Sequence, residues 1–134
     1  MQGQVNWAEL FFSSTGRLSR TPFVVSALAL IGFGVLYEAT MPRGVHWLTG
    51  WFIYPAMLYV GACLLSKRLH DRGRSGWLAG LILIALTAIW APPTNAFDFL
   101  FILVLIWTAV ELGFLPGEQG ANRFGPNPGR VAQA

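Results

Sequence analysis

Four long apolar runs, separated by short polar connections, restrict the fold of this chain more than any other feature. They cover residues 22–40, 45–66, 76–91 and 97–115. About 20 helical residues cross the apolar core of a bilayer, because each residue adds 1.5 Å. The first, second and fourth runs meet that length, and the third must use flanking residues or locally thin bilayer.

The overall composition points to the same solvent. Charged residues make up 11% of the 134 residues and hydrophobic residues 54%. A soluble chain carries about 25% charged residues, because water must wet its surface. So short a chain cannot bury this much apolar surface within itself. The composition therefore excludes a soluble enzyme domain, a disordered chain, a disulfide scaffold and a basic nucleic-acid binder.

Helices are expected in these runs because a helix satisfies its own backbone in lipid, and the alternating pattern of a membrane barrel is absent. We predict an all-α polytopic membrane protein, with four transmembrane helices forming two hairpins. It is a single membrane domain over residues 1–134. Residues 1–21 form a cytoplasmic or interfacial segment, and residues 116–134 form a cytoplasmic tail.

The N-terminal segment carries a short helical pattern of its own. Trp7, Leu10 and Phe11 recur at the spacing of one helix face, which predicts a short helix lying on the membrane surface. The polar residues that precede the first apolar run argue against a cleaved signal peptide. We therefore expect the first run to stay in place as a membrane anchor.

Positive charge is distributed unevenly among the connections. Eight of the nine Lys and Arg residues fall in the N-terminal segment, the middle connection and the tail, and Arg43 is the exception. Loops rich in Lys and Arg stay on the cytoplasmic side, so both termini are expected there. Interfacial anchors are expected at the aromatic residues near the ends of the runs. They are Trp7, Phe11 and Trp77 at the inner interface, and Trp47, Trp51 and Trp90 at the outer one.

Three polar motifs lie on this cytoplasmic side. They are GRLSR at residues 16–20, KRLHDRGRSGW at residues 67–77 and NRFGPNP at residues 122–128. With this order and spacing, the chain resembles the domain of unknown function 805 family of small bacterial inner-membrane proteins, from about Leu10 to Pro128. Val24 and Leu78 depart from the family, which usually shows an aromatic pair at each place. The resemblance implies a location in the bacterial inner membrane and implies no activity.

The same motifs supply the candidate site. The candidate residues for binding an anion, a lipid or a partner are Arg17, Arg20, Arg68, His70, Arg72, Arg74, Ser75, Asn122 and Arg123. Asp71 and Glu111 are expected to pair with arginines, because a guanidinium group donates paired hydrogen bonds to a carboxylate. In one interpretation these pairs only hold the loops and tail together. In the other, the cluster captures an anionic headgroup, a phosphorylated metabolite or an acidic segment of a partner.

Other classes of function have weaker support in the sequence. His70, Asp71 and Ser75 have the residue types of a hydrolytic triad but sit in one short turn, so we expect no enzyme. Two histidines and the lone Cys63 give no metal site, and no cofactor motif is present. The middle of every apolar run is uncharged, whereas transporters place ionisable residues there.

We therefore predict a structural, accessory or regulatory membrane component whose arginine-rich face binds anionic lipid or a membrane-protein partner. That partner includes a second copy of the chain. A small transporter or channel formed by oligomerisation is the alternative, and an enzyme acting on a lipid phosphate is a distant one.

Overall fold

The computed structural model describes residues 6–128, and within that range it is helical with no strands. The helices are α1 (Trp7–Phe12), α2 (Arg20–Thr40), α3 (Arg43–Asp71), α4 (Leu78–Ala88) and α5 (Ala96–Thr108), the last continued by a π-helical segment, η1 (Ala109–Phe114). The all-α prediction is confirmed. The short N-terminal helix is also present: Asn6 caps it, and Leu10 turns into the protein core.

Among residues 6–128, three helices are long and apolar enough to cross a membrane: α2, α3, and α5 together with η1. The third apolar run forms a shorter helix than predicted. It was expected over residues 76–91, but regular α-helix covers only Leu78–Ala88, which spans about 16 Å. Turns at both ends, with Pro92 after the second, shorten it.

The end of α3 also differs from the prediction. The second apolar run was predicted to cross the membrane over residues 45–66, and α3 continues past it to Asp71. Lys67, Arg68 and Asp71 stay helical because each finds a polar partner within the protein and is buried there. The chain then turns at Gly73, whose φ of +70° is the left-handed conformation that glycine adopts without steric cost.

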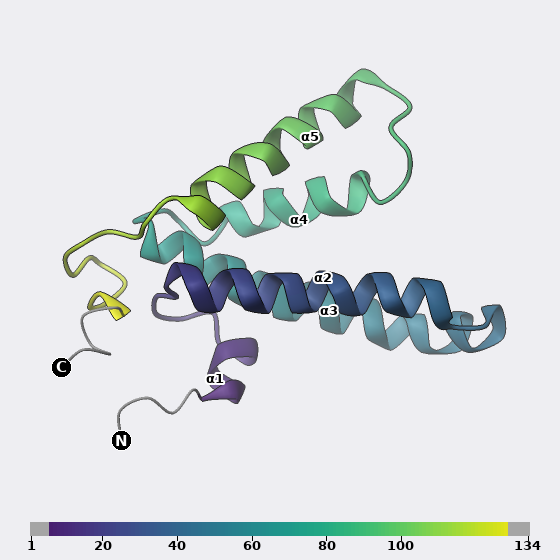
Figure 1. The fold of residues 1–134 in the computed structure, drawn as a ribbon, viewed down its shortest axis with the longest axis horizontal. Helices are drawn as coiled ribbons and strands as arrows, with labels where there is room; N and C mark the ends of the chain where they lie inside the picture. Colours follow the sequence, from purple (N-terminus) through teal and green to yellow (C-terminus); the bar gives the residue numbers. More distant parts are fainter. Residues whose placement is uncertain (1–5, 129–134) are drawn as a thin grey trace.

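α2 packs against α3 and α4 packs against α5, and the α4–α5 pair leans away from the α2–α3 pair (Figure 1). The described parts of the N-terminal segment (residues 6–19) and of the C-terminal tail (residues 116–128) meet the 72–77 loop at one end of the molecule, which we call the arginine end (Figure 1). The turn between α2 and α3 and the loop between α4 and α5 lie at the opposite end (Figure 1).

The hydrophobic core is concentrated toward the arginine end. Its buried members include Leu18 before α2, Leu64 and Leu69 in α3, and Leu112 in η1, which are three different segments of the chain. By contrast, none of the α5 residues from Ala96 to Thr108 is fully buried. The helix faces farther from the arginine end are therefore apolar surfaces that need lipid or protein around them.

Candidate functional site

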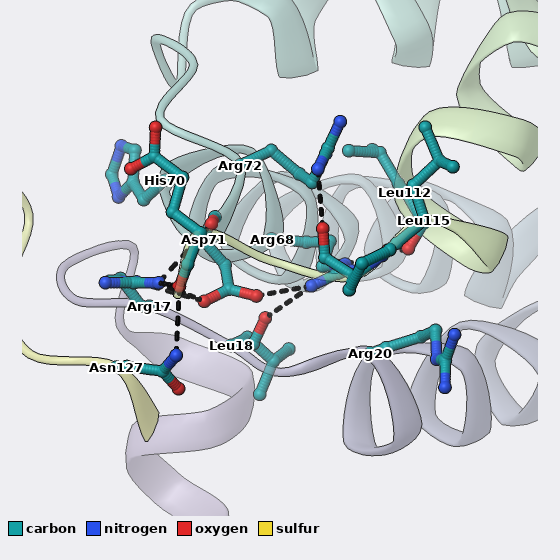
Figure 2. A network of polar contacts seen from close by, with 12 residues as sticks. Arg17, Leu18, Arg20, Arg68, His70, Asp71, Arg72, Leu112, Leu115 and Asn127 are labelled. Atoms are coloured by element: carbon teal, nitrogen blue, oxygen red, sulfur yellow. Dashed lines mark hydrogen bonds and ion pairs between the residues drawn. The ribbon is translucent and has the colours of Figure 1, made fainter. Parts of the chain in front are cut away.

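The Asp71 carboxylate lies between two arginines at the C-terminal end of α3 (Figure 2). One oxygen, Oδ1, accepts hydrogen bonds from Nε of Arg17 at 3.0 Å and forms an ion pair with its Nη2 at 2.9 Å. The other oxygen, Oδ2, accepts from Nη1 of Arg68 at 2.5 Å. All three side chains are almost completely buried, so their charges depend on one another for compensation.

The side chain of Arg68 is fully buried, so its N–H groups need hydrogen-bond acceptors within the protein. Besides Asp71, it donates to the backbone carbonyl oxygens of Leu18, Leu112 and Leu115. These acceptors belong to the segment before α2, to η1 and to the start of the tail. The planar, five-donor guanidinium group therefore joins three separate parts of the chain to α3.

Arg17 ties the tail to the same point. It donates to the carbonyl oxygens of Glu118 at 2.6 Å and Gly120 at 2.7 Å. The backbone N–H of Glu118 also donates to the carbonyl of Asp71 at 2.8 Å. The tail thus crosses the end of α3 and is fixed there by both backbone and side-chain hydrogen bonds.

Glu111 forms the second centre of charge. Its Oε1 accepts hydrogen bonds from Nη2 of Arg72 at 3.0 Å and from Nε of Arg74 at 3.3 Å, and it forms an ion pair with both arginines. The Glu111 side chain is 9% exposed, whereas that of Arg74 is 50% exposed. Two arginines around one carboxylate leave a net positive charge at the surface, on the side where Arg74 lies.

The π-helical turn η1 explains how one helix end meets so many donors. The last carbonyl groups of a helix lack partners within it. Here the carbonyls of Leu112, Phe114, Leu115 and Pro116 accept from arginine side chains, namely Arg68, Arg20, Arg68 again and Arg72. Positive charge at a helix C-terminus is also favoured by the helix dipole. Arginines from three segments therefore cap the end of α5.

Asn122, His70 and Phe124 join the tail to α3 on the other side of the arginine end. Asn122 donates to the carbonyl of His70 at 2.9 Å. The rings of His70 and Phe124 stack, with centroids 3.9 Å apart and planes 7° apart. The guanidinium group of Arg123 lies over the ring of Phe124, 4.7 Å from its centroid.

Comparison with known proteins identifies a family and two relatives that this chain matches. The model of the family described as "Protein of unknown function (DUF805)" matches residues 11–126. The chain belongs to the DUF805 family. It is similar to "Uncharacterized protein YiiR" of Escherichia coli strain K12, with 32% identity over 123 residues that cover 85% of this chain and 84% of the relative. The protein of the same name from Escherichia coli O157:H7 matches equally well. No solved structure matches the chain.

All three motifs that carried the resemblance to DUF805 proteins meet at the arginine end. The structure brings Arg17, Arg68 and Asp71 into one group, and Arg72, Arg74 and Glu111 into another. Arg20 lies at the edge of the second group, on the carbonyl of Phe114. His70, Asn122 and Arg123 gather with Phe124 as a third group, and Ser75 lies near it.

The three residues with the types of a hydrolytic triad are not linked as one in this DUF805 protein. Nδ1 of His70 pairs with the carbonyl of Gly16 at 2.9 Å, and the Asp71 carboxylate faces the arginines. The hydroxyl of Ser75 accepts from the backbone N–H of Trp77. Each polar group therefore holds a loop or a helix end in place.

The aromatic anchors lie on the surface of the protein. Trp7, Trp47, Trp51, Trp77 and Trp90 are all exposed, and Phe11 is partly buried and stacks on Trp7. Trp77 is the most exposed of them, at 91%, and it is the last residue of the 72–77 loop at the arginine end. Trp47 and Trp51 lie near the start of α3, at the other end of the molecule.

Sequence reasoning missed two further polar arrangements. Nζ of Lys67 is buried and donates to the carbonyls of Glu9 and Leu10, which fixes α1 to α3. At the opposite end, His46 and Tyr54 both contact the Glu38 carboxylate. A signal for this second group exists, because Glu38 and His46 flank the short turn between α2 and α3 and must lie close together.

Three threonine hydroxyls in α3, α4 and α5 donate hydrogen bonds within their own helix. Thr49, Thr87 and Thr108 donate to the carbonyls of Val45, Leu83 and Val104, each four residues earlier. None of these contacts needs a water-filled path. The polar chemistry of the described chain is therefore concentrated at the helix ends, and chiefly at the arginine end.

Gly117 provides a test of how tightly the tail is held. A Cβ atom added there would overlap the Asp71 carboxylate, which two arginines keep in place. We expect Gly117→Ala to lower the free energy of unfolding by about 1–3 kcal/mol. Thermal unfolding in mild detergent measures this loss. Gly120→Ala is the matched control, because nothing lies within 4 Å of its Cβ position, and equal melting temperatures for the two variants would contradict the arrangement.

Proposed function

We propose that this protein is a bacterial inner-membrane protein with four transmembrane helices and both termini in the cytoplasm. In this proposal it serves as a structural, accessory or regulatory membrane component that binds anionic lipid at its arginine end. The observation that carries the proposal is that some arginines at this end have buried side chains and others have exposed ones. Arg17 and Arg68 are buried in the fold, whereas Arg20 and Arg74 are exposed at its edge.

The geometry of the second hairpin supports four crossings. With η1, α5 has 19 residues and extends about 28 Å, and it ends at the arginine end. Its start is therefore about one bilayer thickness away. The chain reaches that start from the arginine end through α4 and its flanking turns (Figure 1). A crossing by α4, with its turns and thinned lipid, follows from this path.

Charge supports the orientation and the ligand class. The cytoplasmic leaflet carries the anionic lipid headgroups that attract juxtamembrane arginines. At the arginine end the described cations are Arg17, Arg20, Lys67, Arg68, Arg72, Arg74 and Arg123, and the described anions are Glu9, Asp71, Glu111 and Glu118. This end therefore has a net positive charge, and much of the excess lies on exposed arginines.

Site-directed labelling tests the topology. In a Cys63→Ser background, single cysteines replace Met41, Ala91 or Gln119, all of which are exposed. A membrane-impermeant maleimide should label positions 41 and 91 in intact spheroplasts, and position 119 only after lysis. Labelling of 41 and 91 from opposite sides would contradict four crossings, and labelling of 119 in intact cells would contradict the orientation.

Lipid retention tests the binding proposal. The double variant Arg20→Gln/Arg74→Gln should retain several-fold less phosphatidylglycerol than the wild type in native mass spectrometry, because each arginine offers a charge-assisted hydrogen bond to phosphate. Bilayer discs of phosphatidylglycerol and phosphatidylcholine supply the lipid. Arg43→Gln is the matched control, since this exposed arginine lies at the opposite end. Equal retention by all three proteins would refute the proposal.

A further inference from the structure

An open groove of about 550 Å³ lies at the arginine end, between the C-terminal part of α3, the start of α4 and the tail. We call it the His70 groove. Its lining includes Ser66, His70, Ser75, Trp77, Arg123 and Phe124. It lies outside the two carboxylate centres, which use none of these residues.

Arg123 gives the groove an uncompensated positive charge. Its guanidinium group rests on the ring of Phe124, and that ring stacks on His70. Over residues 6–128, no ion pair involves Arg123, and no carboxylate lines the groove. The stack positions the cation at the groove while leaving its N–H donors available to a ligand.

His70 presents a defined nitrogen to the groove. Its Nδ1 lies 2.9 Å from the carbonyl oxygen of Gly16, which can only accept, so Nδ1 carries the proton. The other nitrogen, Nε2, lies beside Gly76, where an added Cβ would be 3.0 Å from Nε2 and 3.2 Å from the Ser66 hydroxyl oxygen. With the proton on Nδ1, Nε2 is a hydrogen-bond acceptor next to that hydroxyl.

We infer that the His70 groove binds a phosphate monoester group, through Arg123, His70 and the hydroxyls of Ser66 and Ser75. This inference rests on the proposed function, because it needs the arginine end at the level of the inner headgroups. A monoester carries up to two negative charges on three terminal oxygens, which the Arg123 guanidinium and the serine hydroxyls match, and a monoester oxygen that keeps its proton donates to Nε2 of His70. A diester offers less charge and fewer terminal oxygens.

Two sources can supply this chemistry: a phosphatidic acid headgroup or a soluble phosphate ester. The exposed indole of Trp77 lies on the rim of the groove, as an anchor at headgroup level would. Ligand entry from the membrane and from the cytoplasm therefore lead to the same residues. The experiment includes both kinds of ligand.

The test compares wild type with Arg123→Gln, Ser75→Ala and the control Arg43→Gln, each checked for folding by thermal unfolding. In bilayer discs with equal phosphatidic acid and phosphatidylglycerol, the wild type should retain more phosphatidic acid. Arg123→Gln should reduce that retention about tenfold, and Ser75→Ala should reduce it less. Stabilisation of the detergent-solubilised protein by glycerol 3-phosphate or inorganic phosphate, lost in Arg123→Gln, would support the inference with a soluble source.

Two results would overturn the inference. One is equal retention of the two lipids by the wild type together with no stabilisation by either soluble phosphate. The other is equal behaviour of Arg123→Gln and Arg43→Gln. If Arg20→Gln/Arg74→Gln still loses phosphatidylglycerol in that case, the proposed function stands and only the groove fails. If no variant changes the retention of any anionic lipid, both fail.

Discussion

Asp71→Asn should lower the free energy of unfolding by about 3–5 kcal/mol, because it removes the shared counter-charge of two buried arginines. The carboxylate touches Arg17 with one oxygen and Arg68 with the other. An amide of the same shape keeps one acceptor oxygen but supplies no negative charge. Two guanidinium groups are then buried beside each other without compensation. Thermal unfolding in mild detergent should show a loss on the order of 10 °C.

The control for Asp71→Asn is Glu9→Gln, which makes the same chemical change at an exposed position of the arginine end. This substitution should leave the melting temperature nearly unchanged, since a surface charge contributes little to stability. The loss in Asp71→Asn should also be accompanied by faster proteolysis of the tail, because Arg17 and Asp71 both hold residues near Glu118. A melting temperature equal to that of Glu9→Gln would mean that the ion pairs do not stabilise the fold.

Much of the fold follows from the apolar pattern of the sequence, because lipid leaves a backbone few alternatives to a helix. The helix ends follow less well. The second apolar run ends at Ser66, whereas α3 continues through Lys67, Arg68 and Asp71. Apart from the Arg68–Asp71 pair, their side-chain partners lie 44 to 58 residues away in sequence. A local pattern contains no information about such distant partners, so the true end of α3 could not be predicted.

In the candidate site, too, part of the arrangement could be predicted from the sequence and part depends on the tertiary fold. Asp71 and Glu111 were singled out because a carboxylate among arginines has few other partners, and the structure places each of them against two arginines. Which arginine faces which carboxylate depends on how the tail crosses α3. The carbonyl acceptors at the end of η1 were also beyond prediction, because every residue has a carbonyl and only the tertiary fold leaves particular ones unpaired.

Arg68→Lys isolates the part of this network that depends on the shape of guanidinium. The substitution keeps a positive charge for Asp71, but an ammonium group cannot reach the carbonyls of Leu18, Leu112 and Leu115 together. Each buried carbonyl left without a donor costs about 1–3 kcal/mol. We expect a total loss of about 2–5 kcal/mol of unfolding free energy. We also expect faster hydrogen exchange of the backbone amides in η1 and the following residues, since Arg68 fixes that turn to α3.

Arg74→Lys is the matched control for Arg68→Lys, because Arg74 is half exposed and shares the Glu111 carboxylate with Arg72. Lysine can keep that surface ion pair, so the melting temperature should change little. If Arg68→Lys also melts like the wild type, with η1 equally protected, then a charge at position 68 is sufficient. The three carbonyl contacts would then add nothing to stability. A large loss in Arg68→Lys alone would show that the end of α5 is held by the geometry of the guanidinium group as well as by its charge.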